Sequence, residues 1–215
     1  MTDVSQGADE RGRRPRMTAS ERREQLIEIA RAAFAERGVE GTSVEEIAAR
    51  AEVSKPVVYE HFGGKEGLYA VVVDREVRRL LDMMGHALTA GHPRELLEQA
   101  ACALLDYVET SSDGFRILVR DSPIGSASGS FVSIIGDVAS RVEHILGAEF
   151  AARGFDATYA PMYSQMLVGM VGTTGQWWLD AREPAKEVVA AHLCNLAWNG
   201  LSGLEPEPTL IPRAG

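Results

Sequence analysis

Two short helical segments lie only three residues apart between residues 42 and 62. The first is capped by Thr42 or Ser43 and carries apolar residues at helical spacing: Val44, Ile47, Ala48 and Ala51. The second is capped by Ser54 and repeats the pattern with Val57, Val58 and Phe62. The chain is therefore expected to form a compact helical hairpin here.

Longer helical segments flank this pair. A capping residue, Thr18 or Ser20, precedes apolar residues at helical spacing up to Gly38: Leu26, Ile29, Ala30, Ala33 and Phe34. After Gly63 and Gly64, another helix is expected from Lys65 to about Met84. Five more are expected over 94–110, 114–120, 130–153, 159–181 and 185–201. Runs of alternating β-branched residues are few, so the predicted fold class is all-α.

The composition excludes several classes of protein. With 215 residues, 45% hydrophobic and 25% charged, the chain fits a soluble protein of one or two small domains. No apolar stretch approaches the roughly 18 residues that span a bilayer. The N-terminal arginines precede no apolar signal segment, and Cys102 and Cys194 are far apart. We therefore expect a cytoplasmic protein without a membrane helix or a disulfide framework.

Basic charge gathers near the N-terminus although the net charge is −9. Eight arginines face four glutamates between Arg11 and Arg37, a local charge of +4, and such a face can bind phosphate despite an acidic total. Residues 1–17 are polar and are predicted to form a disordered basic arm. Its arginines, Arg11, Arg13, Arg14 and Arg16, would either lie along a DNA groove or keep the protein in solution.

Residues 45–66, EEIAARAEVSKPVVYEHFGGKE, resemble the DNA-binding segment of the TetR family of bacterial transcriptional repressors. A helix-turn-helix needs a small residue where its helices cross, an apolar plug in the turn and a polar cap on the second helix, here Ala48, Val53 and Ser54. The resemblance covers residues 20–70 well and only the architecture beyond. Glu52 departs from it, because the family usually has glycine there, and a positive φ at a non-glycine residue costs about 1 kcal/mol.

The second helix of such a motif places its N-terminal residues in the major groove. This assigns Lys55, Pro56 and Val57 to the groove, together with Glu60 or His61. Lys55 is the candidate for a guanine edge and Val57 for a thymine methyl group.

The resemblance implies further contacts, position by position. Thr42 and Ser43 match the start of a helix whose amides and hydroxyls meet a phosphate, Tyr59 matches a phosphate-contacting tyrosine, and Lys65 matches a lysine near the DNA backbone. Phe62 matches a core residue, and Arg22 and Arg23 are further phosphate candidates. The predicted DNA-binding set is Thr42, Ser43, Ser54, Lys55, Pro56, Val57, Tyr59, His61 and Lys65.

The resemblance also implies two domains and a flexible tail. Residues 18–66 form the helix-turn-helix domain, residues 67–204 a larger helical domain for ligand binding and dimerisation, and residues 205–215 the tail. Such proteins dimerise through their last two helices, and residues 159–181 and 185–201 are apolar on much of their circumference. Gly169, Gly172 and Gly175 indicate a close neighbour in the first of them: a partner helix, which we favour, a kink or a ligand.

Pocket residues are predicted with less support, because core packing explains the same apolar side chains. The candidates are Tyr107, Phe115, Phe131, Met162, Met166, Trp177 and Trp178. Successive residues of a helix are turned by about 100°, so Trp177 and Trp178 cannot face the same side. Candidates for orienting a polar group are Asp106, Arg116, Arg120, His144 and Gln165.

No catalytic, metal or cofactor motif is found. The FGGKE segment lacks the residues of a P-loop, and the five histidines show no metal-ligand spacing. The resemblance implies a bacterial regulator that binds a palindromic operator as a homodimer, and most simply a repressor released from DNA by an unknown small molecule, although activation stays compatible. An enzyme, or a dimeric scaffold that does not bind DNA, is the alternative.

Overall fold

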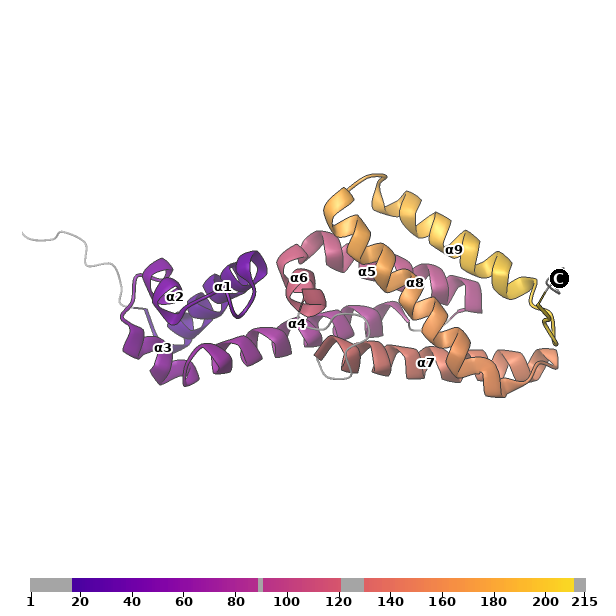
Figure 1. Cartoon of the computed structure of the whole chain (residues 1–215), viewed down its shortest axis with the longest axis horizontal. Helices are drawn as coiled ribbons and strands as arrows, with labels where there is room; N and C mark the ends of the chain where they lie inside the picture. The colour runs from indigo at the N-terminus through magenta and orange to yellow at the C-terminus, as the bar shows by residue number, and fades with distance from the viewer. Residues whose placement is uncertain (1–16, 89–90, 121–129, 211–215) are drawn as a thin grey trace, which may run out of the picture.

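The computed structural model describes residues 17–88, 91–120 and 130–210 (Figure 1). These residues form helices and no strand, which confirms the all-α prediction. The helices are α1 (Ala19–Arg37), α2 (Val44–Arg50), α3 (Lys55–Phe62), α4 (Lys65–Ala87), α5 (Pro93–Thr110), α6 (Ser112–Arg120), α7 (Ser130–Arg153), α8 (Ala160–Ala181) and α9 (Lys186–Ser202). None of these helices is both long and apolar enough to cross a bilayer.

The predicted helix ends agree with local capping. Thr18 forms a capping box with Glu21, in which the Thr18 amide donates to Glu21 Oε2 at 2.8 Å and the Glu21 amide donates to Thr18 Oγ1 at 3.2 Å. The predicted helix 159–181 instead begins with a 3-10 turn, Ala157–Tyr159, because the Asp156 carboxylate caps it. The predicted arm falls almost entirely on residues 1–16, outside the described residues. Residues 205–210 of the tail form no helix.

The long helix α4 joins the two ends of the molecule (Figure 1). Its N-terminal half packs against α1 and α3, and its C-terminal half packs against α5 and α7. One cluster of buried apolar side chains runs along it, from Leu68 and Val72 to Leu80 and Met84. The core is therefore continuous along α4, from one end of the molecule to the other.

Glu76, in the middle of α4, is a buried carboxylate shared by several helices. Its side chain is 5% exposed, and one oxygen accepts a hydrogen bond of 2.7 Å from the hydroxyl of Tyr107 in α5. The other oxygen lies 4.0 Å from Nε of Arg31 in α1. Burial, followed by the charge of Glu76, raises the pKa of Tyr107 far above its usual range, so the phenol remains a donor.

Two further contacts complete this junction. Gly114 of α6 lies so close that a Cβ there would be 1.9 Å from Glu76 Oε2. At the end of α6, Arg120 Nη1 donates to the carbonyl oxygens of Phe34 at 3.4 Å and Ala35 at 3.2 Å, near the C-terminus of α1, where a cation is favoured. Arg120, a predicted ligand-orienting residue, therefore attaches α6 to α1.

We expect Gly114→Ala to lower the free energy of unfolding by about 1–3 kcal/mol, because the new methyl group must displace a buried carboxylate. Gly85→Ala is the matched control. Gly85 is exposed in α4 with no heavy atom within 4 Å of an added Cβ, so alanine should stabilise the protein by up to about 1 kcal/mol. Denaturant titration of both variants measures the difference, and equal stabilities would contradict the close packing at Glu76.

Candidate functional site

The turn between α2 and α3 has the geometry that the sequence predicts. Ala48 is buried where the two helices meet, and the amide of Val53 donates to the Ala48 carbonyl oxygen at 3.0 Å. Val53 packs against the core as the expected plug. Glu52 has a φ of 54°, so the position that usually holds glycine keeps its left-handed backbone at a cost of about 1 kcal/mol.

Helix α3 is anchored on one face and exposed on the other. Val58 is fully buried and Phe62 packs against the core. Lys55 and Pro56 are exposed, and so is Tyr59, at 54%. The helix lies at the end of the molecule away from α5–α9 (Figure 1), so nothing in the described chain covers its outer face. A duplex can approach it there.

The C-terminal end of α3 is held by α1 and α4. A Cβ on Gly67 of α4 would lie 1.9 Å from the Phe62 carbonyl oxygen, so glycine permits this approach. The Arg23 guanidinium lies 4.5 Å from the centre of the Phe62 ring, and its Nη1 donates to the His61 carbonyl oxygen at 3.0 Å. Arg23, a candidate phosphate contact, holds the end of α3 through these contacts.

Thr42 does not present its hydroxyl to solvent, which corrects the predicted phosphate contact. Its side chain is buried, and its hydroxyl donates to the carbonyl oxygens of Gly38 at 2.8 Å and Ala33 at 3.2 Å. Ser43 is the N-cap of α2 and is exposed, with its oxygen accepting the Glu46 amide at 3.1 Å. Thr42 therefore fastens the loop after α1.

Acidic side chains pair with cations of the helix-turn-helix segment. Lys55 pairs with Glu45 of α2, and the hydrogen bond from Lys55 lowers the pKa of Glu45. Arg50 pairs with Glu36 at 2.9 Å and with Glu46 at 2.8 Å. Phosphates must therefore compete with carboxylates for these cations. A count of charges along the sequence cannot show this pairing, because several partners are distant in the chain.

The remaining predicted DNA-binding residues are accessible to different degrees. Those exposed are Ser43, Ser54, Lys55, Pro56 and Tyr59, and those half-buried are Val57, His61 and Lys65. The Ser54 side chain makes no capping hydrogen bond, so its hydroxyl is available at the start of α3.

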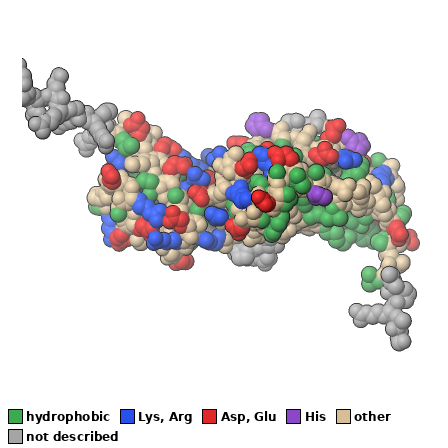
Figure 2. Space-filling model, turned by 90° about the horizontal axis from the view of Figure 1, so that it is seen from above, with side chains coloured by type: hydrophobic (Ala, Val, Ile, Leu, Met, Phe, Trp, Pro, Cys, Tyr) green, Lys and Arg blue, Asp and Glu red, His purple; other side chains and the backbone are tan. Residues whose placement is uncertain are grey.

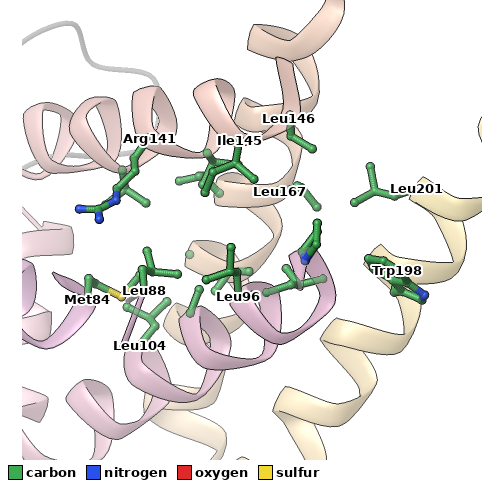
Figure 3. A pocket seen from close by; sticks show the side chains of 18 of the residues that line it. Met84, Leu88, Leu96, Leu104, Arg141, Ile145, Leu146, Leu167, Trp198 and Leu201 are labelled. Atoms are coloured by element: carbon green, nitrogen blue, oxygen red, sulfur yellow. The ribbon is translucent and has the colours of Figure 1, made fainter. Parts of the chain in front are cut away.

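The helical body encloses an apolar cavity of about 150 Å³ between α4, α5, α7, α8 and α9 (Figure 3). Its walls include Met84, Leu96, Leu167 and Trp198, and its charged residues are Arg141 and Glu149 of α7. Apart from these two residues, the side chains that line the cavity in the described chain are apolar. Such a cavity suits a mostly hydrophobic small molecule.

The described residues among those predicted to form a pocket do not line this cavity. Tyr107 and Phe115 are fully buried in the core, and Trp178 is 3% exposed with its indole donating to the Pro184 carbonyl oxygen at 2.8 Å. Three others are exposed on α8: Met162, Met166 and Trp177. The side chain of Phe131 lies outside the described residues. The opposite exposure of Trp177 and Trp178 confirms that they face different sides. No sequence signal separates cavity leucines from core leucines, because both recur at helical spacing.

The three glycines of α8 have different neighbours. A Cβ on Gly175 would lie 3.3 Å from Leu104 Cδ2, so its close neighbour is α5 of the same chain and not the favoured partner helix. Gly172 borders the cavity, and an added Cβ there, or at Gly169, would have no heavy atom within 4 Å.

Comparison with known proteins agrees with this geometry. Residues 26–72 match the family model for bacterial regulatory proteins of the tetR family, and residues 93–200 match that for a tetracyclin repressor-like C-terminal domain. The chain belongs to the TetR family. It is a DNA-binding transcriptional regulator of the helix-turn-helix type and not an enzyme.

Relatives of this TetR-family chain carry different regulatory names. The HTH-type transcriptional activator FasR of Mycolicibacterium smegmatis is 31% identical over 217 residues, covering 94% of this chain and 97% of that protein. The HTH-type transcriptional repressor Rv3405c of Mycobacterium tuberculosis is 32% identical over 134 residues, 59% of this chain and 63% of that one. A TetR-like regulator from Rhodococcus sp. RHA1 has a TM-score of 0.71 at 27% identity, covering 88% of this chain and 100% of that chain.

We expect Thr42→Val to lower the free energy of unfolding by about 1–3 kcal/mol, because two buried carbonyl groups lose their donor. Thr42→Ser keeps the hydroxyl and is the control. At a temperature where both variants are folded, DNA affinity measured by gel shift should match that of the wild type. A large loss of affinity in folded Thr42→Val would restore the predicted phosphate contact.

Proposed function

We propose that this regulator binds a palindromic operator as a homodimer and that a small molecule in the cavity releases it from DNA. The observation that carries the DNA-binding part is the anchoring of α3 through Val58 and Phe62, with its outer face exposed at the end of the molecule. Two copies related by a two-fold axis would place their α3 helices in successive major grooves, about 34–36 Å apart. Such a regulator acts in the bacterial cytoplasm, on the nucleoid.

In this proposal the accessible residues of the site have separate roles. Lys55 leaves Glu45 to reach a guanine edge, and the exposed part of Val57 contacts a thymine methyl group. Tyr59, with Ser43 at the start of α2, contacts phosphates. The remaining members, Ser54, Pro56, His61 and Lys65, lie at the start and end of α3 and at the start of α4.

An exposed apolar face on α8 and α9 supports the dimer. Met162, Met166 and Trp177 on α8 are 45–56% exposed, and Val188 and Leu196 on α9 are also exposed. Figure 2 views the molecule from the α9 side and shows hydrophobic side chains gathered over this part of the body. Large exposed apolar patches mark interaction surfaces, and a two-fold axis would let the same face bury itself.

The contacts of α4 are evidence for the proposed coupling between the cavity and the DNA-binding end. Leu80 and Met84 line the cavity, and Glu76 lies one turn before Leu80 in the junction with α1 and α6. Arg75 of α4 also pairs with Glu24 of α1. A ligand that displaces α4 at Met84 would therefore move the DNA-binding end, with a coupling of about 1–3 kcal/mol. Release of DNA by such a ligand makes the protein a repressor.

The position of α4 also supports the domain division that we propose. We place the DNA-binding unit at residues 18–66 and the ligand-binding and dimerisation unit at residues 67–204. The body then contains nearly all of α4, and the junction at Glu76 lies on its surface toward α1.

We expect Tyr59→Ala to weaken binding to all operator variants alike, because a phosphate contact carries no base information. Lys55→Ala should instead relax discrimination at one base pair by about 1–3 kcal/mol. Gel shifts on an operator selected from random DNA, and on its point variants, measure both effects. Tyr59→Phe is the control for the hydroxyl, and equal losses for Lys55→Ala on every variant would refute its assignment to a base.

We expect Met166→Glu to convert the dimer to monomers in analytical ultracentrifugation, because two carboxylates would be buried near the two-fold axis. Operator affinity should fall with it. Ser140→Glu, which adds the same charge to an exposed position of α7, should remain dimeric. A Met166→Glu variant that stays dimeric would place the interface elsewhere.

A further inference from the structure

The shape of the cavity limits what can occupy it. Helix α4 and its C-cap contribute Leu80, Met84 and Leu88, one side chain per turn, and α7 contributes a stripe from Arg141 to Glu149. Eight residues of helix extend for about 12 Å. The lining residues follow this length, so the cavity forms an elongated channel. One unbranched chain fits such a channel better than a fused-ring system does.

The two charged residues that line the channel distinguish its two ends. Arg141 and Met84 lie at one side of the cavity, and Trp198 and Leu201 at the other (Figure 3). Arg141 is exposed and makes no hydrogen bond or ion pair with any residue that the structure describes. Glu149 lies two turns further along α7, so the two ends differ in charge.

We propose that the ligand is an unbranched aliphatic monocarboxylate of roughly ten carbons, with its carboxylate on Arg141 and its chain directed toward Trp198. This inference rests on the proposed ligand control and names its chemistry. A guanidinium presents a planar fork of donors that matches a carboxylate, and an apolar lining suits the chain. Glu149 disfavours a second acid group at the far end.

The position of Arg141 favours this anion over a cation held by Glu149. Arg141 lies beside Met84 of α4, the helix that continues to Glu76 and the DNA-binding end. A head group at Arg141 therefore contacts the element that must move. A head group at Glu149 would lie two turns of α7 away from Arg141.

Gly172 provides a way to close the channel without disturbing the fold. It borders the cavity, and an added Cβ would have no heavy atom within 4 Å. A leucine there has room to extend into the channel, and leucine is a better helix former than glycine.

The test is titration of the full-length protein with decanoate, 1-decanol and decylamine, followed by isothermal calorimetry and by the fluorescence of Trp198, assigned with Trp198→Phe. We expect decanoate to bind most tightly. Arg141→Gln should weaken the affinity for decanoate about tenfold or more and change the affinity for 1-decanol by less than twofold. Arg78→Gln, which removes an arginine from the outer face of α4, is the matched control and should leave decanoate affinity unchanged. Gly172→Leu should abolish the binding of both decanoate and 1-decanol.

The outcomes separate this inference from the proposed function. The carboxylate assignment would be overturned if decylamine bound most tightly and lost its affinity in Glu149→Gln. It would also be overturned if the affinity for decanoate were unchanged in both Arg141→Gln and Gly172→Leu. Gel shifts with wild-type protein then test the control of DNA binding. Decanoate that binds through Arg141 without releasing the operator supports the ligand class and refutes ligand release. Operator binding by a protein that has no affinity for decanoate refutes the ligand class and leaves the proposed DNA binding intact.

Discussion

The buried carboxylate of Glu76 is the interaction on which the arrangement of the two ends depends. A charge taken out of water is costly unless hydrogen bonds and an opposite charge satisfy it. Here Tyr107 of α5 donates to it, Arg31 of α1 lies near it, and Gly114 of α6 leaves it room. Loss of either polar partner would leave the buried carboxylate without its donor or its nearby cation, so α1, α5 and α6 are linked at the middle of α4.

The DNA-binding end is held mainly by apolar packing, in contrast to the buried carboxylate at Glu76. Helix α3 has only eight residues, too few to be stable alone, and it persists because Val58 and Phe62 are held by the core and by Arg23. Its outer face then remains free for recognition. In the structure, which contains no DNA, carboxylates such as Glu45 pair with the nearby cations.

The body accommodates a cavity without losing its core, because the channel and the junction use different faces of the same helices. Tyr107 and Phe115 fill the space beneath α6, whereas Leu96 and Leu104 of α5 face the channel. Gly175 lets α8 approach Leu104 closely, and one turn earlier Gly172 leaves space open. A ligand in this space would press on α4 close to the buried charge.

The sequence by itself determined the helices, their caps and the α2–α3 turn, because these depend on neighbours within a few residues. It also indicated that Trp177 and Trp178 must diverge, which follows from helical geometry. Only the tertiary structure decided that Thr42 is buried, that Arg23 and Arg120 hold helices together, and that the cavity is lined by Met84, Arg141 and Trp198. Those outcomes depend on which distant side chains meet, and a local pattern does not contain that information.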